Sequence, residues 1–223
     1  MRFKGFIALF TAVLLAYGSL AQNAGELSQS RILILLDASS SMLNPWAGGS
    51  VKYKVAEKVI LKLMDSIYTV NPNVEFSLRV FGHQYTVPEN NCHDTRNEVP
   101  FSRGNRLQME YRLDDIKPLG VTAIAYSLKQ AALYDLTDEE HNVYSIILLT
   151  DGGESCGGNI CEVMKMLISH KVFFRPYIIG LEEVPGLQKE YECMGDYLQV
   201  TKQGDIPKAI GIIVDAFRPI LKM

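Results

Sequence analysis

Residues 32–41 read Ile-Leu-Ile-Leu-Leu-Asp-Ala-Ser-Ser-Ser, an apolar run that ends in an acid followed by hydroxyl side chains. A continuous apolar run of this length is typical of a strand that is buried on both faces, as in parallel sheets. Residues 143–149 form a second such run, which also ends in polar residues, Thr150-Asp151-Gly152. The two runs predict neighbouring buried strands whose polar ends lie at one edge of a sheet.

Segments with helical periodicity separate the predicted strands. Helices are expected over residues 51–70, 105–116, 122–134, 160–169, 185–194 and 205–221, and further strands over 74–81, 97–101, 172–179 and 197–201. In the second of these helices, Leu107, Tyr111 and Ile116 are the expected inward residues. The alternation predicts an α/β fold, a doubly wound and mostly parallel six-stranded sheet with helices on both faces.

Composition narrows the class of protein. The chain has 223 residues, of which 48% are apolar and 21% charged, which is typical of a globular protein rather than a disordered one. Its 22 basic and 25 acidic residues give a formal charge of −3. This balance argues against nucleic acid as the partner, because phosphate binding requires a surplus of Lys and Arg.

The N-terminus has the pattern of a signal peptide. Arg2 and Lys4 precede an apolar run over residues 6–17, and Ser19 and Ala21 supply the small residues that a signal peptidase requires. We therefore expect residues 1–21 to be a signal peptide and residues 22–223 a single domain. The run is short for a membrane-spanning helix, so the mature chain is expected to be periplasmic or extracellular with no transmembrane segment.

Export favours disulfide bonds between the four cysteines. Cys156 and Cys161 flank a short Gly-rich loop, so we expect them to pair, which leaves Cys92 and Cys193 as the second pair by default. A metal site is the weaker alternative, because the spacing does not match a zinc knuckle.

Oxygen-bearing side chains gather where the fold rule places binding sites. Asp37, Ser39 and Ser41 follow the first buried strand, Asp151 follows the second, and Thr122 precedes a helix. Carboxylates and hydroxyls without imidazole or thiolate suit Mg²⁺ first, with Mn²⁺ or Ca²⁺ as alternatives. A cation with mostly neutral ligands stays short of negative charge, which favours an anionic oxygen from a partner as its last ligand. Each segment alone could be only a helix cap or a turn.

This set of residues resembles the metal-ion-dependent adhesion site of von Willebrand factor type A domains, which consists of Asp-x-Ser-x-Ser, a distal Thr and a distal Asp. The resemblance spans residues from about 31 to the end, and the Asp-Gly-Gly-Glu-Ser-Cys-Gly-Gly sequence from Asp151 is most similar to secreted bacterial members. One departure is Ser40, where many members carry Gly. The resemblance implies strand order 3-2-1-4-5-6, with the third strand antiparallel, and a last helix that shifts when a ligand binds.

The resulting hypothesis is an exported, metal-dependent protein-binding domain that is not an enzyme, whose cation accepts a carboxylate from a partner protein. One alternative is a structural or assembly component of an envelope complex that uses the fold without metal-gated binding. Another is a serine hydrolase, because Gly153-Glu154-Ser155-Cys156-Gly157 matches Gly-x-Ser-x-Gly. Only His170 follows Ser155 as a candidate base, on a helix that runs away from the strand ends, so the hydrolase is disfavoured. The sequence does not fix the oligomeric state.

Overall fold

The structure is a computed structural model that describes residues 29–138, 140–169 and 176–221. The predicted signal peptide lies outside the described residues. A six-stranded sheet forms the centre of the molecule, in the order β3-β2-β1-β4-β5-β6. The strands are β1 (Gln29–Asp37), β2 (Glu75–Phe81), β3 (Thr95–Arg103), β4 (Asn142–Thr150), β5 (Tyr177–Gly180) and β6 (Asp196–Gln199).

The pairing of the strands confirms the predicted sheet. Strands β1, β2, β4, β5 and β6 pair in parallel, and β3 runs antiparallel to β2 at the edge. The central strand β1 pairs with β2 and β4 over most of its length, and its residues from Leu33 to Leu36 are fully buried. Burial on both faces explains why this strand reads as a continuous apolar run rather than an alternating one.

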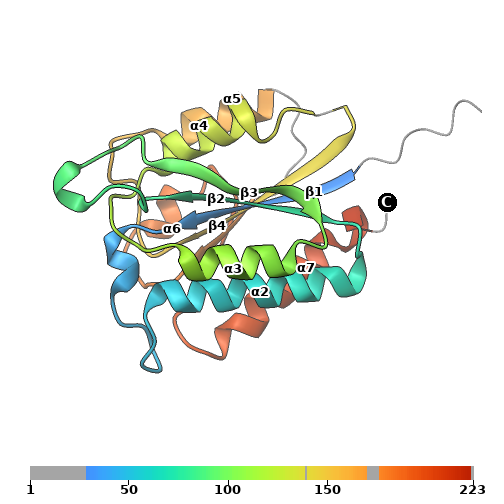
Figure 1. Ribbon diagram of the computed structural model, residues 1–223, viewed down its shortest axis with the longest axis horizontal. Helices are drawn as coiled ribbons and strands as arrows, with labels where there is room; N and C mark the ends of the chain where they lie inside the picture. The colour runs from blue at the N-terminus through green and yellow to red at the C-terminus, as the bar shows by residue number, and fades with distance from the viewer. Residues whose placement is uncertain (1–28, 139, 170–175, 222–223) are drawn as a thin grey trace, which may run out of the picture.

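Helices cover both faces of the sheet (Figure 1). The long helices α2 (Lys52–Val70) and α7 (Asp205–Leu221) pack with α3 (Arg106–Asp115) on one face, and α4 (Ile124–Tyr134) and α5 (Ile160–Ser169) cover the other. The short helix α6 (Leu187–Glu190) and the 3₁₀ turns η1 (Ser40–Leu43) and η2 (Val87–Glu89) lie in the connections. One apolar cluster lies on each side of the sheet, and the two share no buried residue, as expected for a three-layer α/β fold.

The predicted inward face of α3 is partly wrong. Ile116 is buried, but Leu107 and Tyr111 are 78% and 76% exposed, and the buried residues of this helix are Met109 and Leu113. Leu107 and Tyr111 are one helical turn apart and share a face of the helix, as predicted. That face is exposed, however, and the face that carries Met109 and Leu113 is the one that packs inward. The helix has few apolar residues, and packing against α2 selects which of them face inward.

None of the helices within the described residues combines the length and the apolar character that crossing a membrane requires.

Candidate metal site

Three segments meet at the carboxyl-terminal edge of the sheet. The residues after β1 pair with the loop that precedes α4, where Ser39 and Gly120 form a bridge and Ser40 N donates to Gly120 O at 2.9 Å. β4 lies beside β1 in the sheet and therefore ends next to the same serines. The carboxyl ends of adjacent parallel strands share one edge, so Asp37 and Asp151 come together although they are far apart in sequence.

Hydrogen bonds link four of the five predicted ligand residues, and Thr150 also holds the carboxylate of Asp37. Asp37 Oδ1 accepts from Ser39 N at 2.8 Å, and Asp37 Oδ2 accepts from the Thr150 hydroxyl at 2.6 Å. The Ser39 and Ser41 Oγ atoms are 3.1 Å apart, and Ser41 Oγ donates to Asp151 Oδ1 at 2.8 Å. Two carboxylates and two serine hydroxyls thus form one connected group.

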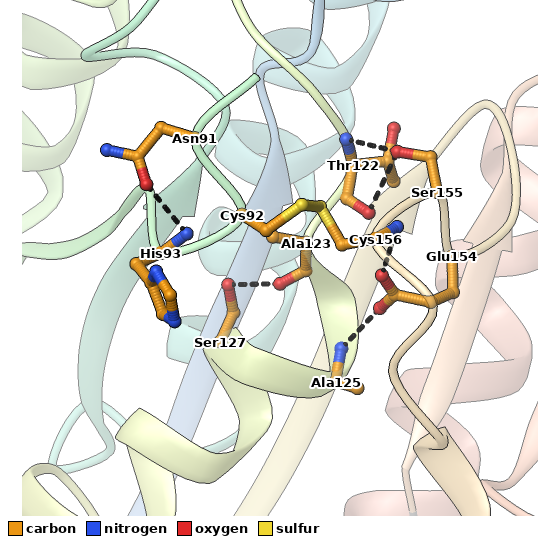
Figure 2. The surroundings of a disulfide bond; sticks show 10 residues. All are labelled: Asn91, Cys92, His93, Thr122, Ala123, Ala125, Ser127, Glu154, Ser155 and Cys156. Carbon is orange, nitrogen blue, oxygen red and sulfur yellow. Dashed lines mark hydrogen bonds between the residues drawn. A yellow bond between two sulfur atoms is a disulfide. The ribbon is translucent and has the colours of Figure 1, made fainter. Parts of the chain in front are cut away.

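Thr122, the fifth predicted ligand, lies on the loop that is bonded to Ser40. Its side chain is largely buried, with the residue 8% exposed, and its backbone is bonded to Ser155 (Figure 2). The structure therefore brings the Thr122 segment to the edge where the other four residues lie.

Gly82, the residue after β2, allows these segments to approach so closely. It has φ +73°, a conformation that disfavours any residue with a Cβ. A Cβ there would lie 2.8 Å from Val121 O and 2.9 Å from Ser39 N. Gly82 O also accepts from Leu119 N and Gly120 N, so the turn that follows β2 supports the loop that carries Thr122.

Lys52, which was not predicted from the sequence, supplies a buried positive charge to the site. Lys52 is 4% exposed, and its Nζ donates to Asp151 Oδ2 at 2.8 Å and pairs with Glu182. Burial acts to lower the pKa of this ammonium, but its hydrogen bonds to Asp151 and Glu182 outweigh burial and raise it. One feature of the sequence could have indicated this burial: Lys52 lies in the first turn of a predicted helix, on the same face as its apolar residues.

Burial and like charge shape the electrostatics of the two acids. The pKa of Asp37 is raised to about 6, first by burial and then by the charge of Asp151, against the lowering effect of hydrogen bonds from Ser39 and Thr150. Two neighbouring carboxylates repel each other when both are ionised, and burial increases the cost. A cation between them would relieve this repulsion. The five predicted donor residues carry hydroxyls and carboxylates, with no imidazole or thiolate among them. The donor set therefore fits a hard divalent cation.

Both predicted disulfide pairs are wrong. The structure joins Cys92 to Cys156 and Cys161 to Cys193, with Cα atoms 5.6 Å apart in each pair. Cys156 lies in the loop after β4 and faces the β2–β3 loop across the sheet edge, whereas Cys161 lies in the first turn of α5 and faces the segment after α6. The prediction relied on proximity in sequence, but the start of a helix between Cys156 and Cys161 directs their side chains to different neighbours.

Ser155, the candidate hydrolase nucleophile, is bonded to backbone atoms. Its Oγ accepts from Thr122 N at 2.9 Å and donates to Thr122 O at 3.2 Å. The candidate base His170 lies outside the described residues. Ser155 thus has an evident role in the local structure that requires no catalysis.

The proteins to which this chain is similar match most of its length. No family model matches it. Two proteins of Bacillus subtilis (strain 168) are similar in sequence, and both are described as uncharacterized. YwmC is 29% identical over 189 residues, which cover 80% of each chain. YwmD is 27% identical over 218 residues, which cover 92% of each.

Solved structures identify the fold. A von Willebrand factor type A protein from Catenulispora acidiphila matches 87% of this chain and 42% of its own, with a TM-score of 0.60 and 18% identity. The chain has the von Willebrand factor type A fold. BatB from Bacteroides thetaiotaomicron, described as a conserved hypothetical protein, matches with a TM-score of 0.64 and 20% identity over 87% of this chain and 100% of its own.

A third structure shows this fold with a metal. Proximal thread matrix protein 1 from the mussel byssus, with a zinc-occupied metal-ion-dependent adhesion site, matches 86% of this chain and 46% of its own. The TM-score is 0.65 and the identity 17%, so the likeness concerns the fold. The resemblance to von Willebrand factor type A domains is therefore confirmed at the level of the fold.

Proposed function

We propose that this protein is an exported, metal-dependent protein-binding domain that acts by binding rather than by catalysis. Asp37, Ser39, Ser41, Thr122 and Asp151 would hold one divalent cation, and the cation would accept a carboxylate from a partner protein. The observation that carries this proposal is the convergence of three segments, distant in sequence, on one sheet edge with linked hydroxyls and carboxylates. Export is supported by the two disulfides.

The chemistry of the ligands favours Mg²⁺, with Mn²⁺ as a close substitute. Both are hard cations that prefer oxygen, and neutral hydroxyls dominate the proposed set. Zinc in the adhesion site of the mussel protein supports a divalent cation at the corresponding place. Lys52 neutralises part of the charge of Asp151, so a bound cation would keep an excess of positive charge that attracts an acidic group.

Calorimetry with Mg²⁺ and Mn²⁺ tests the metal site. The chain from Gln22 onward should bind one cation, and Asp37→Ala or Thr122→Ala should weaken binding at least about tenfold. Thr69→Ala is the matched control, because Thr69 carries the same hydroxyl on the exposed face of α2, and this variant should bind like the wild type. Absence of binding by the wild-type protein would contradict the proposal.

The carboxylate acceptor is tested separately with immobilised acidic peptides. Binding of Asp- or Glu-containing peptides should require Mg²⁺, disappear in EDTA, and fail for the same peptides with Asn or Gln. Partner binding that persists in EDTA would instead favour the structural or assembly role, in which the fold acts without a metal.

A further inference from the structure

Ser155 binds both backbone polar groups of Thr122 (Figure 2). Its Oγ accepts from Thr122 N at 2.9 Å and its own N donates to Thr122 O at 3.0 Å, in addition to the 3.2 Å bond from Oγ to that carbonyl. The position of the Thr122 backbone, and with it the origin of the side chain, is therefore set by one residue on a different loop.

Glu154 extends this connection to the start of α4. Its Oε2 accepts from Ala125 N at 2.7 Å, and its Oε1 accepts from Cys156 N at 2.7 Å. One carboxylate thus bridges the first turn of α4 and the backbone of the cysteine that follows Ser155, as Figure 2 shows. Residues 154–156 and the segment from Thr122 to Ala125 form a single hydrogen-bonded unit.

The Cys92–Cys156 disulfide attaches this unit to the β2–β3 loop. The ring of His93, next to Cys92, packs edge-on against Tyr126 of α4 with ring centroids 4.6 Å apart. At its other end, the same loop begins with Gly82, whose carbonyl accepts from Leu119 and Gly120. The loop that carries Thr122 is therefore enclosed between two segments that are joined covalently.

We propose that Ser155 and the Cys92–Cys156 disulfide are positioning groups for Thr122, so that cation binding depends on the oxidation of this disulfide. This inference rests on the proposed metal site. A ligand must be held to within about 0.5 Å of its productive place. Reduction by a small dithiol transfers two electrons and two protons to the disulfide, giving two thiols and leaving the reductant as a cyclic disulfide. It detaches residues 154–156 from the β2–β3 loop without changing any proposed ligand.

The second disulfide provides a matched control. Cys92, Cys156 and Cys161 are partly exposed and Cys193 is exposed, so a reductant would reach both bonds, and variants are needed to separate them. We expect the double variant Cys92→Ser/Cys156→Ser to bind Mn²⁺ about tenfold more weakly than the wild type. Cys161→Ser/Cys193→Ser, which alters only the α5–α6 side, should bind within about twofold of the wild type.

Ser155 is tested by removal and rescue. Ser155→Ala loses both side-chain hydrogen bonds to Thr122 and should weaken Mn²⁺ binding about tenfold. Ser155→Thr keeps the hydroxyl and should restore affinity, which a general loss of stability would not predict.

Amide hydrogen exchange without metal provides an independent measurement. The Thr122 and Ser155 amides should exchange faster in Cys92→Ser/Cys156→Ser than in Cys161→Ser/Cys193→Ser, because only the first pair of substitutions detaches the segment that contains Ser155. Equal Mn²⁺ affinity and equal exchange in all variants would overturn the positioning role while leaving the proposed metal site intact. A wild-type protein that binds no Mn²⁺ would overturn both.

Discussion

Lys52 places a buried positive charge between two acids at the sheet edge. Its Nζ contacts Asp151 and Glu182, and the side chains of Lys52 and Asp151 are 5% and 2% exposed. A buried ion pair is costly to break from one side, because the remaining charge stays away from water without a partner. Lys52 thus supports the proposed site by compensating Asp151 when no cation is present.

Lys52→Met tests this role, since methionine keeps much of the volume and removes the charge. In EDTA we expect the free energy of unfolding to fall by about 3 kcal/mol, as for other buried pairs that lose one member. Lys54→Met is the control: Lys54 lies on the same helix, pairs with Glu57 and Asp114, and is half-exposed, so its loss should cost about 1 kcal/mol or less. Urea denaturation of both variants measures the difference, and equal costs would contradict the role of Lys52.

Glu98 connects the edge strand β3 to α3 and to the end of β2. Its carboxylate accepts from His83 Nε2 at 2.7 Å and Arg112 Nε at 2.6 Å, and it pairs with Arg96. Burial acts to raise the pKa of Glu98, but the hydrogen bonds from His83, Arg96 and Arg112 outweigh burial and lower it to about 2. An antiparallel edge strand with one neighbour in the sheet gains an additional attachment from this group.

The lowered pKa predicts how stability changes with acid. Glu98 stabilises the fold fully above its ordinary pKa of 4.5, and this contribution is lost as the pH falls toward about 2. Glu98→Gln should therefore reduce the free energy of unfolding at pH 7 and flatten its decline between about pH 4.5 and pH 2. Urea denaturation at several pH values checks this, and parallel curves for the two proteins would show that Glu98 is not responsible.

At the scale of the whole molecule, each disulfide joins segments far apart in sequence. Cys92–Cys156 spans 64 residues and joins loops at the edge where the proposed metal site lies, whereas Cys161–Cys193 spans 32 residues and joins α5 to the segment after α6. In the chain-entropy model the stabilisation grows only with the logarithm of the loop length, so the two bonds should contribute similarly.

We expect removal of either disulfide by paired Ser substitutions to cost about 4 kcal/mol, with the longer loop costing about 0.6 kcal/mol more. Urea denaturation of the two double variants measures both costs. A gap of several kcal/mol would show that the bonds do more than restrict the unfolded chain, and would remove the Cys161–Cys193 variant as a matched control for metal binding.

Local patterns in the sequence predict the layers of this molecule and the order of its strands and helices along the chain. The apolar runs 32–36 and 143–149 specify buried strands, since each must hide both faces, and their periodic neighbours specify helices. The helix over 51–70 was predicted to within one residue because its apolar positions repeat over five turns. The sequence also predicted that Asp37, Ser39, Ser41 and Asp151 lie close together, because the ends of adjacent parallel strands are adjacent in space, and hydrogen bonds link these four residues.

Features that depend on contacts between distant segments become evident in the folded molecule alone. The partners of the four cysteines, the phase of α3, the buried Lys52 and the bonds from Ser155 to Thr122 leave no local pattern. Hydrophobic periodicity indicates which face of a helix or strand is apolar, but it does not indicate which loops meet at a sheet edge. That choice follows from packing of the whole chain, where burial and hydrogen bonding of all segments are satisfied together.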